Sequence, residues 1–325
     1  MPSPSRPALP LILTATEAAD LARLRTLHDR WAETVASGPI IDLEQAFPLP
    51  SDLPGLLGQL TVLERCLASF RPFNAGQMRV LQEQFDTEYT YESNRIEGNT
   101  LSWQETDLVV NKGMTIGGKP LKDHLEAVNH QFAIGLIRDL AAADRDFSEE
   151  ALLRLHAVIL QGIDHANGGV YRTVRVRIKG GTHVFPNPAK VPELMRDYFA
   201  FYGAHADGWH PVALAAAMHA KLVNIHPFID GNGRTARLVM NLILLRAGYP
   251  ITIIASENAS RSAYYDALGA FDRDETSPDF PTFVARNVRR WCLILLDLVA
   301  SDIAAEARGK GYFFFKSIEP LLRSG

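Results

Sequence analysis

Apolar residues recur at helical spacing along most of the chain. The pattern predicts helices at about residues 16–37, 55–70, 75–96, 102–112, 120–141, 148–162, 190–205, 211–225, 233–247, 258–270 and 279–308. The stretch 38–54 is rich in proline and turn residues, which indicates an irregular connector. The sequence therefore predicts a mainly α protein, built as a helical bundle.

One segment departs from the helical period. Residues 174–178 alternate in a β-like way, Gly180 and Gly181 can turn the chain, and residues 182–185 run back before Pro186. This order of alternation, turn and return predicts a short β-hairpin.

Composition places the chain among folded globular proteins. Of its 325 residues, 47% are hydrophobic and 22% are charged, so it can bury a large core, and its length allows two or three compact regions. The formal net charge of −4 provides no general basic field, and we expect no specific nucleic-acid partner.

The sequence offers no signal for a membrane or an export route. The richest apolar run, at 291–300, falls short of the roughly 20 residues that span a bilayer. The apolar stretch 9–13 near Met1 is too short for a signal peptide and contains Pro10. Cys66 and Cys292 lie far apart in apolar helical surroundings and are expected to be reduced core residues. We therefore expect a cytoplasmic protein that makes no contact with a membrane.

A polar turn is predicted between two of the apolar helices. Residues 226–237 follow the helix at 211–225 and precede the apolar stretch 238–247, and they include a histidine, an aspartate, two glycines and two arginines. Each residue alone has an ordinary interpretation, because an aspartate before a helix is usually a cap and a Gly-x-Gly is usually a turn. Their combination favours a site for the phosphates of a nucleotide.

The glycines and arginines of this turn are suited to bind anions. Gly231 and Gly233 carry no side chain, so backbone N–H groups can converge on a ligand, and the first N–H groups of the following helix lack partners within the helix. Arg234 and Arg237 lie three positions apart on one helical face, where both guanidinium groups can reach the same polyphosphate.

The two remaining polar residues supply metal and proton chemistry. Asp230 provides one carboxylate, and one carboxylate with phosphate oxygens and water is a usual way to hold Mg²⁺. His226 changes charge near neutral pH, so its imidazole is a candidate base for an incoming hydroxyl.

The turn resembles the signature of Fic-domain proteins, His-Pro-Phe-x-Asp/Glu-Gly-Asn-Gly-Arg-x-x-Arg, and it matches every fixed position. The resemblance implies a helical bundle of the Fic type, with a short β-hairpin flap over the active site. It also implies a protein adenylyltransferase, which transfers AMP from ATP to a Ser, Thr or Tyr hydroxyl of a protein target or of itself and releases pyrophosphate. The resemblance is best over about 148–286.

The resemblance also implies a role for each residue of the turn. His226 would deprotonate the target hydroxyl, and Asp230 would hold Mg²⁺, or Mn²⁺ in its place, beside the ATP. The residues implied to bind the phosphates are Gly231, Asn232, Gly233, Arg234 and Arg237.

A second motif lies upstream. Ser93, Glu97 and Gly98 resemble the inhibitory motif Ser/Thr-x-x-x-Glu-Gly/Asn, carried on a helix that packs over the nucleotide site. A glutamate at a helix C-terminus is electrostatically unfavourable and needs a partner. The resemblance names Arg237 as that partner, so Glu97 would occupy the place of the terminal phosphate and inhibit the enzyme.

The resemblance assigns further segments with less detail. Residues 174–186 would form the flap that orders the protein substrate by strand pairing, and residues 169–172 (Gly-Val-Tyr-Arg) also resemble the family. Tyr264 and Tyr265 would line the nucleotide pocket, and Tyr265 is the one predicted to bind the nucleotide. Phe271 stands where some relatives carry an asparagine near the base, which leaves the choice of base open.

Four regions are predicted along the chain. They are an N-terminal helical region (1–74), a helical region with the inhibitory motif 93–98 (75–147), the catalytic domain (148–286), and a C-terminal helix with its tail (287–325). Alternatives to adenylyl transfer are removal of AMP from a modified protein with Glu97 as the base, an enzyme with both activities, and a non-catalytic module. Homo-oligomerisation is left open.

Overall fold

The computed structural model describes residues 43–71, 73, 75–143, 147–177 and 184–300. The helix predicted at 16–37, the glycine pair of the predicted hairpin and the last residues of the helix predicted at 279–308 lie outside these residues.

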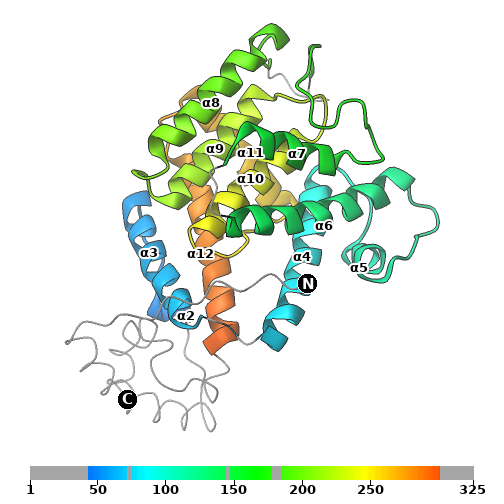
Figure 1. The fold of residues 1–325 in the computed structure, drawn as a ribbon. Helices are drawn as coiled ribbons and strands as arrows, with labels where there is room; N and C mark the ends of the chain where they lie inside the picture. The colour runs from blue at the N-terminus through cyan, green and yellow to red at the C-terminus, as the bar shows by residue number, and fades with distance from the viewer. Residues whose placement is uncertain (1–42, 72, 74, 144–146, 178–183, 301–325) are drawn as a thin grey trace, which may run out of the picture. The chain divides into compact units, whose positions relative to one another are not determined.

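The described residues form helices joined by turns and irregular segments, and no strand is assigned among them. In chain order, the elements are α2 (Leu43–Ala46), α3 (Leu53–Ser69), α4 (Ala75–Ile96), α5 (Trp103–Lys112), α6 (Leu121–Ala142), α7 (Glu149–Ile159), η1 (Pro188–Lys190), α8 (Val191–His205), α9 (Pro211–Ile225), α10 (Asn232–Arg246), α11 (Asn258–Arg273) and α12 (Asp279–Ala300). The prediction of a mainly α fold is confirmed (Figure 1).

Helix boundaries follow the sequence pattern closely, with two informative differences. The short α2 lies within the stretch predicted to be irregular, because four residues are too few to show a helical period. Helix α7 ends at Ile159, three residues early, and Gly162 follows with a left-handed φ of 71°. The described ends of the predicted hairpin, 174–177 and 184–185, have no assigned strand, so the hairpin stays a prediction.

The chain divides into two compact units, one formed by Met1–Arg79 with Arg289–Gly325 and the other by Val80–Val288. In the first unit the side chains of Cys66 and Cys292 are both buried, as predicted for core residues. In the same unit the buried Arg289 donates hydrogen bonds to the Gln59 side chain (2.8 Å) and to the backbone oxygen of Phe47. The four regions predicted from the sequence stay a prediction.

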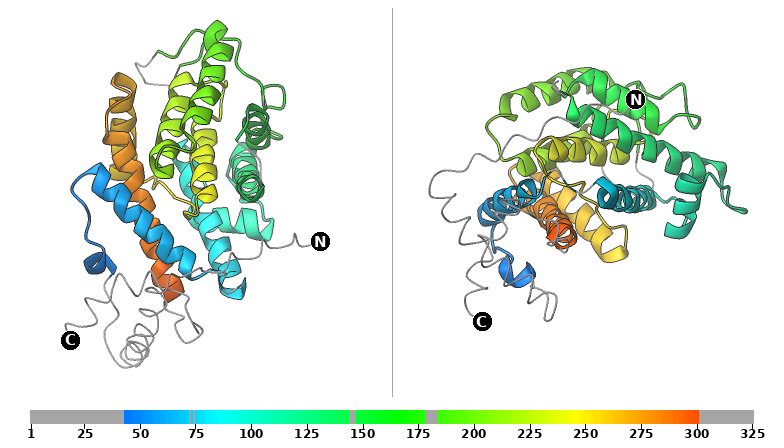
Figure 2. Two further views of the ribbon diagram at one scale, coloured as in Figure 1. Left: turned by 60° about the vertical axis from the view of Figure 1, so that its left-hand side comes forward. Right: turned by 60° about the horizontal axis from the view of Figure 1, so that its bottom comes forward.

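Helix α10 lies at the centre of the second unit. It contacts α9, α6 and α7, and α8 and α11 pack on α9. The pairing of α9 with α10 can be followed in Figure 1 and in both views of Figure 2. Every residue from Arg234 to Leu244 is buried, so α10 is fixed along its length. A buried helix of this kind is a rigid support for chemistry at its N-terminus.

Local capping explains where the helices around this centre begin and end. The side chain of Ser102 accepts the Glu105 N–H while Glu105 accepts the Ser102 N–H, a capping box that starts α5. His210 caps α9, with Pro211 at its first position. Helix α4 ends at Ile96 and Gly98 follows with φ of 97°, a conformation that favours glycine.

Among the described residues, no helix is both long enough and apolar enough to cross a membrane.

Candidate active site

His226 lies at the C-terminus of α9 in an unusual backbone conformation. Its φ and ψ of 51° and 58° are left-handed, and among the described residues it is the only non-glycine with positive φ. Such a conformation costs about 1–2 kcal/mol and is common at functional sites. Nδ1 lies 3.2 Å from the Val223 carbonyl, which only accepts, so Nδ1 carries the proton of this bond. The proton-accepting lone pair therefore lies on Nε2, as a base requires.

Two residues with no individual role predicted from the sequence hold His226 in place. The buried Arg172 donates from Nε to the His226 carbonyl (2.7 Å) and from NH2 to the Pro186 carbonyl (2.8 Å). Phe185 stacks on the imidazole with ring centroids 3.8 Å apart. The guanidinium group of Arg172 and the ring of Phe185 therefore fix the polar turn at 226–237 to the end of the predicted flap.

Asn232 closes the turn between α9 and α10. Its side chain accepts from the Phe228 N–H and donates to the Phe228 carbonyl, each at 2.9 Å. The side-chain amide of Asn232 thus makes hydrogen bonds within the loop itself. Gly231 precedes it with φ of 78° and provides no side-chain cap for α10, so the first N–H groups of α10 have no cap from that residue.

The buried His156 of α7 contacts this turn. Its Nδ1 accepts the Gly169 N–H (2.9 Å), so Nε2 carries the proton and donates to the Asp230 carbonyl (2.9 Å). The ring also stacks on Phe228, with centroids 3.6 Å apart. Burial lowers the pKa of His156 to about 4, which keeps the ring neutral and preserves this tautomer at neutral pH. A side chain on Gly231 would press against the ring, since its Cβ would lie 3.3 Å from Nε2.

Asp230 is half-exposed at the mouth of the turn. Burial alone would raise its pKa, but Arg234, the Gly231 N–H (2.6 Å) and Lys122 (3.4 Å) outweigh it, and the pKa of the carboxyl lies below its usual value. Asp230 is therefore ionised at neutral pH and can act as a ligand for a divalent cation.

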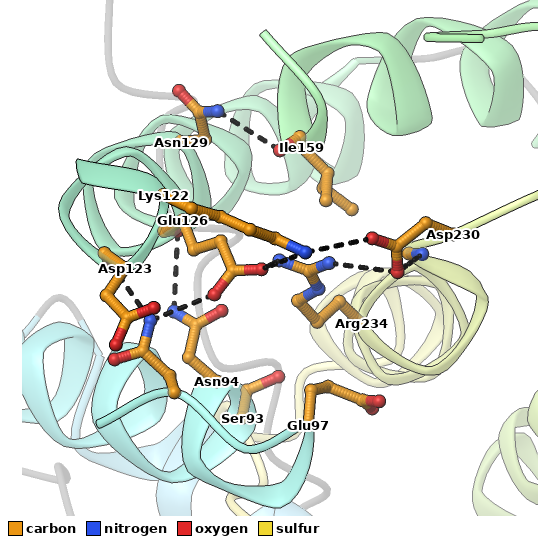
Figure 3. Close-up of polar contacts among 12 residues, drawn as sticks. Ser93, Asn94, Glu97, Lys122, Asp123, Glu126, Asn129, Ile159, Asp230 and Arg234 are labelled. Carbon is orange, nitrogen blue, oxygen red and sulfur yellow. Dashed lines mark hydrogen bonds and ion pairs between the residues drawn. The ribbon is translucent and has the colours of Figure 1, made fainter. Parts of the chain in front are cut away.

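Glu126 of α6 connects three charged or polar groups around the turn (Figure 3). Its buried carboxylate lies 3.0 Å from NH1 of Arg234, accepts from the Asn99 amide (3.0 Å) and lies 3.6 Å from the Lys122 amine. Lys122 in turn reaches Asp230. The guanidinium of Arg234 is thus held between the carboxylates of Glu126 and Asp230, while the Asn99 contact ties the same carboxylate to the segment that follows α4.

We predict that Glu126→Gln lowers the melting temperature by roughly 6–12 °C, because breaking a buried ion pair costs about 3 kcal/mol and 1 kcal/mol shifts a unit of this size by about 2–4 °C. Far-UV circular dichroism measures the shift. Lys122→Met is the matched control: it also removes one partner of Glu126, but Lys122 is 54% exposed, so we expect a change of about 2 °C or less. Equal melting temperatures for the two variants would contradict a stabilising role of the buried ion pair between Glu126 and Arg234.

Arg237 lies one turn further along α10 and makes the ion pair predicted from the sequence. Its NH2 lies 2.7 Å from the Glu97 carboxylate and donates to the Ser93 carbonyl (2.8 Å), and its Nε donates to the Ser93 hydroxyl (2.9 Å). The guanidinium is 1% exposed, and burial would lower its pKa, but Glu97 reverses this and the pKa is raised. Among the described residues, its buried NH1 has no hydrogen-bond partner.

Glu97 lies directly over the start of α10. A Cβ on Gly233 would come within 2.3 Å of a Glu97 carboxylate oxygen, so only glycine fits while the pair is formed. Figure 3 shows Ser93, Asn94 and Glu97 on the α4 side, facing Arg234 and Asp230. The Asn94 amide anchors this end of α4, donating to the Glu126 carbonyl at 3.4 Å.

These groups surround a cleft of about 580 Å³. His226, Asp230, Gly233 and Glu97 line it, and Tyr265, 44% exposed, lies at its edge with the Arg261 guanidinium 5.5 Å from the ring centre. The cleft is large enough for a nucleotide.

The aromatic residues predicted to lie near the base of the nucleotide differ in their exposure to solvent. Tyr264 also lines the cleft but is 2% exposed, and its hydroxyl lies 3.1 Å from Nε2 of His219. Phe271 is buried in the core and does not line the cleft. Of the tyrosine pair, Tyr265 therefore offers the accessible ring.

The residues of the cleft fit one divalent cation only if the nucleotide supplies most of its ligands. Among the described residues no group of three or more His, Cys, Asp or Glu side chains could hold a metal ion. Asp230 offers one ionised carboxylate, which suits Mg²⁺ bound mainly by phosphate oxygens and water. The Lys122 amine now lies beside that carboxylate and would give way to the cation.

Sequence reasoning missed the supports of the site. Arg172 belongs to a segment that had been noted, yet its contacts with the catalytic turn were not foreseen. His156 occupies a position on a predicted helix and was given no role, and Glu126 looks like any acid on an amphipathic helix. Each acts through a partner at least 54 positions away, a distance that local patterns do not report.

Comparison with known proteins agrees with this geometry. A model of the Fic/DOC family matches residues 146–244. The chain is 36% identical over 226 residues to "Protein adenylyltransferase Fic" of Culex quinquefasciatus, a match that covers 69% of this chain and 44% of that protein. The chain thus spans less than half the length of the curated relatives that it matches.

Solved structures share the fold. A Fic domain containing signaling protein from Bacteroides thetaiotaomicron is 29% identical with a TM-score of 0.61, covering 77% of this chain and 95% of that chain. A fragment of Fic-1 from C. elegans is also 29% identical, with a TM-score of 0.66 and coverage of 75% and 71%.

Proposed function

Because residues 146–244 of the chain form a domain of the Fic/DOC family, we propose that the protein is an adenylyltransferase that moves AMP from ATP to a hydroxyl of a protein. The observation that carries the proposal is that His226 and Asp230 line one cleft at the N-terminus of a buried helix, together with Glu97, the ion-pair partner of Arg237. Relatives that are named protein adenylyltransferases share about a third of their residues with the chain over the matched region.

The proposed reaction uses groups that line the cleft and two arginines of α10. Nε2 of His226 accepts the proton of a Ser, Thr or Tyr hydroxyl, and the hydroxyl oxygen attacks the α-phosphorus of ATP. The bond from the α-phosphorus to the bridging oxygen breaks, and pyrophosphate leaves with that electron pair. The helix N-terminus, Arg234 and Arg237 stabilise the negative charge on the phosphates. Mg²⁺ bound at Asp230 would neutralise charge on the leaving group.

Glu97 is proposed to inhibit this reaction. Its carboxylate holds Arg237 through a 2.7 Å ion pair and lies above Gly233, where the phosphates would approach the helix. Mutual repulsion between this carboxylate and a terminal phosphate would force the triphosphate into an unproductive position. Release of the end of α4, or loss of the Glu97 charge, would then activate the enzyme.

Removal of AMP from a modified protein is the second candidate. Glu97 is 34% exposed in its side chain and lines the same cleft as His226, so its carboxylate is placed to activate water beside a bound AMP group. Release of AMP from a pre-modified protein, lost on Glu97→Gln, would favour this reaction over transfer.

The choice between transferring AMP and transferring a phosphoryl group is tested by the position of the label in ATP. We expect the Glu97→Gly protein with Mg²⁺ to incorporate label from α-³²P-ATP into itself or into lysate proteins, and to incorporate at most about 1% as much from γ-³²P-ATP. Pyrophosphate should appear in equal amount. Incorporation from the γ position would show phosphoryl transfer, and no incorporation from either would contradict the proposed function.

A further inference from the structure

A second cavity adjoins the nucleotide cleft. Its volume is about 510 Å³, and Asn224 and Asp272 line both spaces. Its walls come from α8, from the end of α9 and from the end of α11 with the residues that follow, and Val184 and Pro186 contribute from the loop before α8. A space of this size is typical of ligand sites. We name it the flank pocket.

The loop residues place the flank pocket beside the point of reaction. Phe185 stacks on the imidazole of His226 and lines the nucleotide cleft, whereas its neighbours Val184 and Pro186 line the flank pocket. Val184 is 79% exposed, which is unusual for a large apolar side chain. A polypeptide that brought a hydroxyl to His226 would therefore carry an adjacent side chain past this pocket.

The pocket is lined mainly by apolar and acidic groups. Leu194 and Phe201 form an apolar wall on α8. Among the described residues, three carboxylates line the pocket against a single amine, that of Lys221. The carboxylates are those of Asp197, Asp272 and Glu275. The lining thus carries an excess of negative charge, which would attract a cation and repel an acid.

Lys221 demonstrates how a cation fits this surface. Its amine lies 2.5 Å from a Glu275 carboxylate oxygen and 4.7 Å from the centre of the Phe201 ring. The pair with Glu275 and the contact with the ring are interactions that a long basic side chain makes when its stem lies on apolar surface and its head meets a carboxylate. Asp197 adds a further carboxylate to the pocket, and Asp272 lines both the pocket and the nucleotide cleft.

We propose that the flank pocket receives a Lys or Arg side chain of the target protein, at a position close in sequence to the modified hydroxyl. The stem of that side chain packs on Leu194, Phe201 and Val184, and its charged head pairs with the carboxylates of the pocket. The pocket thereby determines which hydroxyls are modified. The inference rests on the proposed adenylyl transfer, because it requires the target hydroxyl at His226.

The test uses the full chain with Glu97→Gly and a displayed peptide library in which each peptide has one central Thr and random flanking residues. The peptides are incubated with Mg²⁺ and an alkyne-bearing ATP analogue, and the modified peptides are captured and sequenced. We expect Lys and Arg to be enriched at least fivefold at one position near the Thr. Asp197→Lys, which changes an exposed residue of the flank pocket alone, should reduce this enrichment at least fivefold and favour Asp or Glu there.

Asp207→Lys is the matched control, because it reverses an exposed aspartate just after α8 that does not line the pocket. It should leave the enrichment unchanged, and calorimetry should give the same affinity for ATP in all three proteins. Modified peptides that show no preference for Lys or Arg, or a preference that Asp197→Lys leaves unchanged, overturn the inference about the flank pocket. The proposed adenylyl transfer stands in either case. Absence of label on both the peptides and the protein overturns the proposed function and the inference with it.

Discussion

Replacing Glu97 by glycine is expected to raise the rate of AMP incorporation by about 10- to 100-fold. The wild-type carboxylate accepts a charge-assisted hydrogen bond from Arg237 at 2.7 Å. A hydrogen bond to a charged group contributes about 1.5–3 kcal/mol, which corresponds to roughly 10- to 150-fold in an equilibrium. Loss of the carboxylate makes the same guanidinium available to the terminal phosphate of ATP. The measurement is the initial rate of label incorporation from α-³²P-ATP.

Two further variants separate the charge of Glu97 from the shape of its side chain. Glu97→Gln keeps the size of the side chain and removes its charge, so it should activate nearly as much as glycine. Glu83→Gln removes an exposed acid on the same helix and should leave the rate unchanged. Equal rates for wild type and both Glu97 variants would show that the ion pair with Arg237 does not restrain the enzyme.

His226→Ala in the Glu97→Gly protein is expected to reduce incorporation by about 10²- to 10⁴-fold, the range for loss of a general base. The Nδ1 bond to the Val223 carbonyl fixes the tautomer that leaves Nε2 basic, and stacking on Phe185 fixes the plane of the ring. Binding of ATP should change little, because the phosphates are expected to lie on the glycines and arginines of α10. Single-turnover rates and calorimetry measure the two quantities separately.

His165→Ala provides the control for this substitution, since His165 is an exposed histidine outside the cleft. Its rate and ATP affinity should match those of the Glu97→Gly parent. A His226→Ala protein that retained more than about a tenth of the parental rate would exclude His226 as the base and would direct attention to another proton acceptor.

The sequence predicted the part of the site that is local. A run of polar residues between two apolar, helix-periodic segments located the turn between α9 and α10, and the structure has α9 at the predicted residues. The Glu97–Arg237 pair could also be predicted, because a carboxylate at a helix C-terminus needs a cation and the resemblance named one.

The supports of the site could not be predicted because each depends on the tertiary packing. His156 and Glu126 reach the turn from α7 and α6, and neither shows a local pattern that distinguishes it from a core or surface residue. Asn232 is a different case. The resemblance implied that it binds phosphate, and in the structure its side chain makes hydrogen bonds with the backbone of Phe228. Only the positions of both residues reveal these bonds.

The central claim is that the turn between α9 and α10 binds the triphosphate of ATP with its α-phosphorus facing His226. A crystal structure of the Glu97→Gly protein with Mg²⁺ and a non-hydrolysable ATP analogue tests it most directly. The account predicts phosphates on the N-terminus of α10, the terminal phosphate on Arg237, Mg²⁺ on Asp230 and Nε2 of His226 facing the α-phosphate. A nucleotide bound elsewhere, or one whose α-phosphate points away from His226, would contradict it.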